Sequence, residues 1–350
     1  MTGCIPTRQG KGSPMYAEKP RLHERQKAHR AGDLRTIALD VTPRCNMRCP
    51  HCYAASLLHL GPIELEVLQG ALDEAYDLGV FHYILQGGEP ILEPGRLEAI
   101  LRACHPDETY LNVVTNGWSM SGETVRWLRE LKVDKITFSL DSGIECEHDA
   151  NRMPGSFRRV LAAIECVQAE GLLAGVSTVV SHETLYGKGF RKAYGIARRR
   201  GIRLDVQIAE PVGRWDGQTV HLITPEDARY IKALQLGCPV LANGQKMVSR
   251  DIYSGERDHC PAGTEFMGLT ADGQLLPCNF LQFTLGTIRD RSIREMRDAL
   301  LTSGWFDGRH PGCLCGEDRA FIDCFIKPHV DEPKPLDAWR IFDLPRPQLS

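Results

Sequence analysis

The segment Cys45-Asn-Met-Arg-Cys49-Pro-His51-Cys52 places three cysteines within eight residues, separated by three residues and then by two. A loop of this length can wrap one corner of an iron–sulfur cubane and give thiolates to three of its irons. The fourth iron then keeps an open coordination position, which a catalytic metal needs and a structural site lacks. The alternative is a zinc site with His51 or His59 as its fourth ligand. The catalytic cluster, with all three cysteines as its ligands, is preferred because the loop lies beside other motifs at the predicted strand ends.

Apolar runs of strand length alternate with amphipathic stretches of helix length from Thr36 onward. The predicted strands are residues 36–41, 81–85, 110–115, 135–140, 175–180 and 204–209. The predicted helices between them are 65–76, 94–103, 122–131, 156–170 and 189–200. Strand–helix units in series imply parallel strands joined by right-handed crossovers. The pattern therefore predicts an α/β fold, either an open doubly wound sheet or a partial barrel.

Polar and ligand-type residues follow the predicted strands directly. The cysteine loop follows the first strand, and residues 86–90, 116–117 and 141–142 follow the next three, with Glu210 after the sixth. Chemistry collects at the carboxyl ends of parallel strands in both architectures. We therefore expect these loops to form one active-site rim.

These motifs together resemble the radical S-adenosylmethionine (SAM) superfamily across about residues 36–210. The cysteine loop has that family's spacing, and His51 occupies the usually aromatic position that lies near the adenine of SAM. The resemblance implies a partial (β/α)6 barrel of the TIM type and a 4Fe–4S cluster bound with SAM. It also implies that reductive cleavage of SAM gives a 5′-deoxyadenosyl radical, which abstracts hydrogen from a substrate.

The resemblance implies further contacts to SAM from three other motifs. The implied residues are Gly87, Gly88, Glu89, Pro90, Ser139, Asp141 and Arg152. The segment 87–90 matches the glycine-rich motif that receives the methionine amino group. The segment 139–142 resembles the fourth-strand motif, although Ser142 replaces its usual glycine. Arg152 resembles the arginine that pairs with the SAM carboxylate, a role that suits a bidentate guanidinium.

A second group of cysteines lies near the C-terminal end. Its members are Cys260, Cys278, Cys313, Cys315 and Cys324. Gly273-x4-Cys278 resembles the hairpin of the auxiliary-cluster extensions called SPASM and twitch domains, although the seven-cysteine SPASM pattern is not met. Five candidate ligands suit one auxiliary 4Fe–4S cluster, on Cys260, Cys278 and two or three of the others. We expect Cys313 or Cys315 to be the odd one out, and a zinc site is the alternative.

We expect five segments along the chain: a flexible extension (1–34), a radical SAM core (35–215), a helical linker (216–258), an auxiliary cluster domain (259–327) and a C-terminal tail over the surface (328–350). The linker contains a predicted helix at 224–236. The hydrophobic content of residues 259–326 is thin, so this region is expected to need its metal to fold.

Composition excludes several classes of protein. The 350 residues are 42% hydrophobic and 25% charged with a net charge of −3, so no strong basic field favours nucleic acid. No apolar run of about 18 residues predicts a membrane span, and the N-terminus lacks the apolar core of a signal peptide. Eight of the thirteen cysteines fall into two groups, which indicates metal ligation rather than disulfides. We expect a cytoplasmic protein, reduced by a partner such as flavodoxin or ferredoxin.

Three functions remain open. The first is a radical SAM oxidoreductase or isomerase acting on a small natural-product or cofactor precursor. It is preferred because the 34 residues before the first strand are too few for the leader-binding domain of peptide-modifying relatives. The second is a maturase of a ribosomal peptide or protein. The third is a non-enzymatic iron–sulfur electron carrier or zinc scaffold, which does not explain the 87–90 motif.

Overall fold

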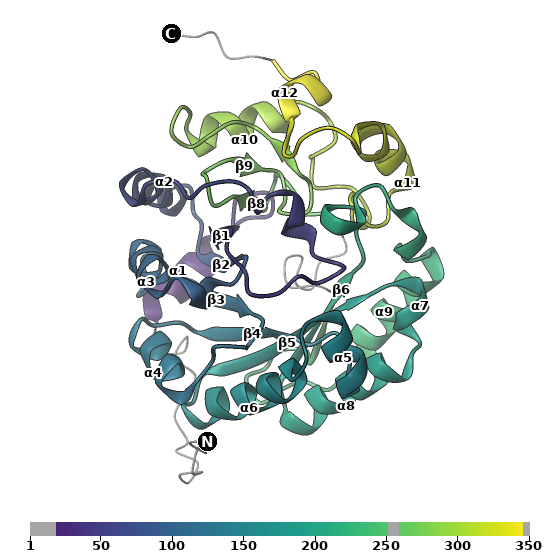
Figure 1. Ribbon diagram of the computed structural model, residues 1–350. Helices are drawn as coiled ribbons and strands as arrows, with labels where there is room; N and C mark the ends of the chain where they lie inside the picture. Colours follow the sequence, from purple (N-terminus) through teal and green to yellow (C-terminus); the bar gives the residue numbers. More distant parts are fainter. Residues whose placement is uncertain (1–18, 251–258, 346–350) are drawn as a thin grey trace.

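The computed structural model describes residues 19–250 and 259–345, and its centre is one curved sheet (Figure 1). The strand order is β7-β6-β5-β4-β3-β2-β1-β8-β9. The six central parallel strands are β1 (Thr36–Thr42), β2 (His82–Gly87), β3 (Tyr110–Thr115), β4 (Lys135–Ser139), β5 (Leu173–Val180) and β6 (Arg203–Ile208). At the two ends lie β7 (Val248–Ser249), which is parallel to β6, β8 (Phe266–Leu269), which is parallel to β1, and β9 (Leu275–Leu276), which is antiparallel to β8.

Helices connect the parallel strands and cover the outside of the sheet (Figure 1). The crossover helices are α2 (Leu65–Asp77), α3 (Pro94–Ala103), α4 (Gly122–Glu130), α5 (Glu145–Asn151), α6 (Ser156–Ala169), α7 (His182–Leu185) and α8 (Lys188–Arg200). Short 3-10 turns follow three strands, at Tyr53–Ser56, Pro90–Leu92 and Gly213–Trp215. The predicted α/β fold of the partial-barrel type is confirmed, and α5 is an element that the sequence did not reveal.

Strand β1 shows how the sequence separates the two faces of the sheet. All seven of its residues are buried, because β2 and β8 pair with its two edges. Alternate side chains point to opposite faces of a strand. Ile37, Leu39 and Val41 join the apolar core, whereas Asp40 lies on the other face, 3.4 Å from the amide nitrogen of Gln86 on β2. The barrel interior is therefore polar near the strand ends.

The N-terminal segment differs from the expected flexible extension over residues 19–34. Helix α1 (Pro20–Ala28) buries Leu22 completely. Just before it, the Lys19 ammonium is 2.6 Å from the Asp134 carboxylate and also donates to two backbone carbonyls. Burial lowers the pKa of Lys19 and raises that of Asp134 to about 6. Residues 1–18 lie outside the described residues.

Replacing Lys19 with alanine is expected to lower the free energy of unfolding by about 3 kcal/mol, because it leaves the Asp134 carboxylate buried without its cation. Urea unfolding followed by circular dichroism measures this loss. The matched control is Arg21→Ala on the same helix, whose side chain is 72% exposed and pairs with Glu108. Exposed pairs contribute at most about 1 kcal/mol. Equal losses in both variants would show that the buried pair has no special role.

The C-terminal half adds short elements around an aromatic core. They are α9 (Pro225–Gly237), β10 (Phe283–Thr284), α10 (Ile293–Leu301), α11 (Arg319–Phe321), the π-helix Ile322–Ile326, β11 (Leu336–Asp337), α12 (Ala338–Ile341) and the 3-10 turns Thr219–His221 and Lys327–His329. The expected surface tail does not hold for residues 336–344. Strand β11 pairs with β10, and the buried Phe342 ring lies 5.0 Å from Phe283 and 5.3 Å from Phe306.

The predicted boundary at residue 259 does not divide the sheet. Strand β8 comes from the cysteine-rich region, yet it pairs with β1 along four residues. The cysteine-rich region is therefore built directly against the first strand of the barrel. Among the described helices, none is both long enough and apolar enough to cross a membrane.

Candidate active site

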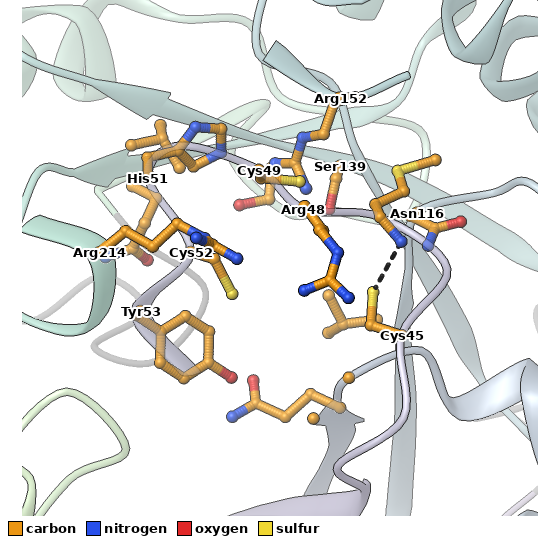
Figure 2. A pocket seen from close by; sticks show the side chains of 18 of the residues that line it. Cys45, Arg48, Cys49, His51, Cys52, Tyr53, Asn116, Ser139, Arg152 and Arg214 are labelled. Carbon is orange, nitrogen blue, oxygen red and sulfur yellow. Dashed lines mark hydrogen bonds between the residues drawn. The ribbon is translucent and has the colours of Figure 1, made fainter. Parts of the chain in front are cut away.

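A cavity opens to solvent at the carboxyl ends of the parallel strands. Its volume is about 1160 Å³ when the solvent space at its mouth is included. Its wall includes all three cysteines of the 45–52 loop, together with residues from the loops after β2, β3, β4 and β6. Figure 2 shows Cys45, Cys49 and Cys52 around this space with Asn116, Ser139 and Arg152. The structure thus brings together strand ends that the sequence placed on one rim.

The chemistry of the three thiols fits an iron–sulfur cluster. None of the described cysteines forms a disulfide. Among the described residues, no three His, Cys, Asp or Glu side chains surround a single ion position. A cubane requires a different arrangement, because each thiolate binds a different iron and the thiols must surround the space that the whole cluster fills. Burial, reinforced by the neighbouring Cys49, raises the pKa of Cys52 to about 11, so ligation has to displace its proton.

The glycine-rich segment holds the start of the cysteine loop. The Gly88 backbone N–H donates to the Thr42 carbonyl at 2.8 Å, and the Glu89 N–H donates to the Arg44 carbonyl at 2.7 Å. A Cβ atom on Gly88 would lie 2.1 Å from the Arg44 carbonyl oxygen, so no larger residue fits without moving the loop. Gly87 and Gly88 also line the cavity. The motif therefore forms part of the cavity wall and also holds the start of the cysteine loop.

Replacing Gly88 with alanine is expected to weaken SAM binding at least about tenfold, because the added methyl group displaces the start of the cysteine loop. Equilibrium binding of SAM to the anaerobically reconstituted protein measures this change, and iron analysis measures cluster retention. Gly70→Ala in helix α2 is the matched control, since its Cβ would meet nothing within 4 Å. Unchanged SAM binding and iron in Gly88→Ala would contradict the tight packing against Arg44.

Glu89 lies behind the cavity wall rather than on it. Its carboxylate accepts hydrogen bonds from the Thr115 hydroxyl and the Asn116 N–H, both at 2.7 Å, and from the Ile91 N–H at 3.2 Å. The residue is 1% exposed, and burial raises its pKa. Glu89 therefore fastens the loop after β2 to the end of β3. Pro90 is buried at the start of a 3-10 turn and does not line the cavity either.

Asp141 and Arg152 form a buried pair beneath the cysteine loop. The Arg152 guanidinium donates through Nε and Nη2 to the two carboxylate oxygens, at 2.6 and 2.8 Å. Burial alone would raise the pKa of Asp141, but Arg152 holds it well below its usual range. His51 Nε2 lies 3.5 Å from the same carboxylate, and burial lowers the pKa of His51 to about 4.

The predicted cofactor residues divide into two sets. Five line the cavity, namely His51, Gly87, Gly88, Ser139 and Arg152, whereas Glu89, Pro90 and Asp141 do not. Asp141 is therefore placed to orient Arg152 and His51. Helix α5, which the sequence analysis missed, ends directly before Arg152 and so brings the guanidinium to this position.

Several residues of the cavity wall were not predicted. Arg48, Arg214, Trp215 and Phe280 are among them. The turn Gly213–Trp215 lies against the cysteine loop, with the Arg214 N–H donating to the Cys52 carbonyl at 3.1 Å. Gly213 has φ of 63°, and a Cβ there would lie 2.2 Å from the same carbonyl oxygen. Gly213, a glycine shortly after the sixth strand, was the sequence feature that could have indicated this close contact.

Four of the five C-terminal cysteines gather beside this cavity. Cys313 and Cys315 interact electrostatically with Cys260, Cys278 and Glu210. The Cys313 Sγ lies 3.7 Å from a carboxylate oxygen of Glu210, which also lines the cavity. Burial raises the pKa of both Cys313 and Cys315.

Cys324 differs from these four cysteines. It is exposed on the π-helix Ile322–Ile326. In residues 19–250 and 259–345, its thiol has no hydrogen bond or electrostatic contact with the other four. The geometry therefore favours Cys324 as the spare thiol, in place of the expected Cys313 or Cys315.

Known proteins resemble the chain along most of its length. A family model for the radical SAM superfamily matches residues 39–190. The chain is 28% identical over 291 residues to the AdoMet-dependent heme synthase of Methanosarcina barkeri, covering 75% of this chain and 81% of that protein. It is 27% identical over 296 residues to the PqqA peptide cyclase of Ruegeria pomeroyi, covering 81% and 77%. Among solved structures, native anSMEcpe with bound AdoMet and Cp18Cys peptide shares the fold of this chain, with a TM-score of 0.59 at 18% identity. The match covers 88% of this chain and 95% of that chain.

Proposed function

Because the chain belongs to the radical SAM superfamily, we propose that it is a maturase that modifies a peptide or protein by radical chemistry. The observation that carries the proposal is the placement of three thiols from the 45–52 loop in the wall of one cavity with the other strand-end loops. Cys45, Cys49 and Cys52 are the proposed ligands of the first 4Fe–4S cluster. When bound, this cluster and SAM supply the 5′-deoxyadenosyl radical that abstracts a hydrogen atom.

The chain's own residues would bind and orient SAM and keep water from the reacting atoms. Ser139 and Arg152 present polar groups from the β4 side of the cavity, and His51 lies at the cluster loop. Trp215 and Phe280 add aromatic rings to the cavity wall, and the Trp215 ring lies 5.8 Å from the His51 ring. Such a wall excludes water and offers few reactive hydrogens close to the cofactor.

Cys260, Cys278, Cys313 and Cys315 are the proposed ligands of one auxiliary 4Fe–4S cluster. Four thiols match the four irons of a cubane, so this site would be closed, unlike the first. Glu210 and Phe280 border the cavity and also contact Cys313 and Cys315. The auxiliary cluster would therefore lie one side chain away from the substrate.

The 27% identity to a protein named PqqA peptide cyclase supports a peptide substrate. The charge of the cavity wall supports an acidic group on that substrate. Arg48 and Arg214 point into the cavity (Figure 2), and neither side chain has a hydrogen bond or ion pair within residues 19–250 and 259–345. Unpaired guanidinium groups favour a carboxylate on the bound segment.

A small-molecule substrate is the second candidate. It is favoured by the 28% identity to a protein named AdoMet-dependent heme synthase. A porphyrin with carboxylate side chains would also suit the two arginines.

Isotope transfer distinguishes the two candidates. The reduced, reconstituted enzyme is incubated with SAM and either perdeuterated peptides encoded beside its gene or a deuterated porphyrin carboxylate. Deuterium in 5′-deoxyadenosine together with a mass change in a peptide is the expected result, and the Cys45, Cys49 and Cys52 triple alanine variant is the control. Transfer from the porphyrin alone would overturn the maturase proposal and support the second candidate.

A further inference from the structure

One buried amide joins the first cysteine loop to the cysteine-rich region. Gln282 donates from Nε2 to the Tyr53 carbonyl at 2.8 Å and accepts from the Ser56 hydroxyl at 2.7 Å. Gln282 is 4% exposed, so water does not replace these bonds readily. Tyr53 directly follows Cys52, the last proposed ligand of the first cluster. The nitrogen and the oxygen of one amide therefore hold the turn Tyr53–Ser56, which follows the last proposed ligand of the first cluster.

The segment that carries Gln282 also belongs to the auxiliary site. It begins at Cys278, and the Leu281 N–H donates back to the Cys278 carbonyl at 3.0 Å. The Phe280 carbonyl accepts from the Cys315 thiol at 3.6 Å. On its other side, the Phe280 ring packs edge-on against the Tyr53 ring at 4.9 Å. Five consecutive residues thus touch two proposed auxiliary ligands and the end of the first loop.

We infer that Gln282 is a positioning residue that couples the two cluster sites. Ligation of the auxiliary cluster by Cys278 fixes the positions of residues 278–282. Gln282 in turn fixes the Tyr53 carbonyl and Ser56 through its two hydrogen bonds. The geometry of Cys52, and hence SAM binding at the first cluster, depends on the auxiliary site being loaded. The inference rests on the proposed ligand roles and adds a dependence between the two sites.

The experiment uses the anaerobically reconstituted holoenzyme with SAM as the probe. Gln282→Leu removes both hydrogen bonds with little change in volume. It is expected to keep about eight irons per chain, to weaken SAM binding about tenfold, and to change the electron paramagnetic resonance spectrum of the reduced, SAM-bound first cluster. Gln274→Leu is the matched control from the same region, because the one hydrogen bond of its amide to a described residue goes to Asp272.

A double-mutant cycle with Cys278→Ala tests the coupling itself. Cys278→Ala is expected to lose the auxiliary iron and to weaken SAM binding by a similar factor. If Gln282 transmits the effect of the auxiliary site, adding Gln282→Leu to Cys278→Ala changes SAM binding by less than about twofold. Multiplicative effects of the two substitutions would overturn the inference, and so would wild-type binding and spectrum in Gln282→Leu.

A milder variant covers the case in which Gln282→Leu fails to fold. Ser56→Ala removes one of the two hydrogen bonds and is expected to weaken SAM binding about threefold with its iron retained. Wild-type SAM binding in Ser56→Ala would then overturn the inference. A wild-type enzyme that cleaves SAM but holds only about four irons would overturn the auxiliary assignment, whereas an unchanged Gln282→Leu variant with eight irons overturns the coupling alone.

Discussion

Replacing Cys45, Cys49 and Cys52 together with alanine is expected to abolish reductive cleavage of SAM and to lower the iron content from about eight to about four per chain. The three thiols are the proposed protein ligands of the first cluster, so their loss removes the cluster that would bind SAM and pass an electron to it. The auxiliary thiols come from other elements and should keep their iron. Iron and sulfide analysis and chromatography of 5′-deoxyadenosine measure the two effects.

The control for this variant is Cys166→Ala on helix α6, which removes a thiol that packs against the core. It is expected to keep both the iron content and SAM cleavage. A triple variant without iron, beside a wild type with only one cluster, would contradict the auxiliary assignment. A fully loaded wild type that does not cleave SAM would contradict the enzymatic proposal itself.

The spare cysteine can be identified by the same iron analysis. Cys324→Ala is expected to keep about eight irons, whereas Cys313→Ala and Cys315→Ala are each expected to lose auxiliary iron. The reason is geometric: Cys324 is exposed, whereas Cys315 is buried, Cys313 is partly buried, and both interact with Cys260 and Cys278. Loss of iron in Cys324→Ala, with full iron in Cys315→Ala, would reverse the assignment.

Local sequence patterns were sufficient for the barrel and for the cysteine loop. The predicted strand 110–115 coincides with β3, and the predicted strand 36–41 is one residue shorter than β1. Such runs are recognisable because burial on both faces requires near-continuous apolar residues in a parallel sheet. The rim could be predicted because parallel strand order alone brings the carboxyl ends together.

The features that the sequence did not reveal depend on distant partners. Lys19 lies in a polar segment, and its buried partner Asp134 is 115 residues away. Phe342 lies among prolines, yet it packs in an aromatic core with Phe283. Glu89 carries a motif whose resemblance implied a ligand contact, but Thr115 and Asn116 occupy its oxygens. Contacts between residues so far apart in the sequence leave no local periodic pattern by which they could be predicted.

Replacing Asp141 with asparagine is expected to lower the free energy of unfolding by about 3–5 kcal/mol, because the Arg152 guanidinium then stays buried without an anion. The side-chain exposures of Arg152 and Asp141 are 13% and 3%, so solvent compensates only in part for the lost charge. Arg152 holds the pKa of Asp141 well below its usual range, so the carboxylate is ionised throughout the neutral range. The loss should therefore be similar at pH 6 and pH 8, as measured by urea unfolding.

The double variant Asp141→Asn with Arg152→Gln separates the structural role of the pair from binding of SAM. Removing both charges is expected to restore most of the lost stability, because a buried pair is often replaced by neutral groups at little cost. Arg152 lines the cavity while Asp141 does not, so SAM binding should stay at least about tenfold weaker than in the wild type. Restored stability with weak SAM binding would assign Arg152 to the cofactor. Wild-type SAM binding in the double variant would limit the pair to holding helix α5 and His51 in place.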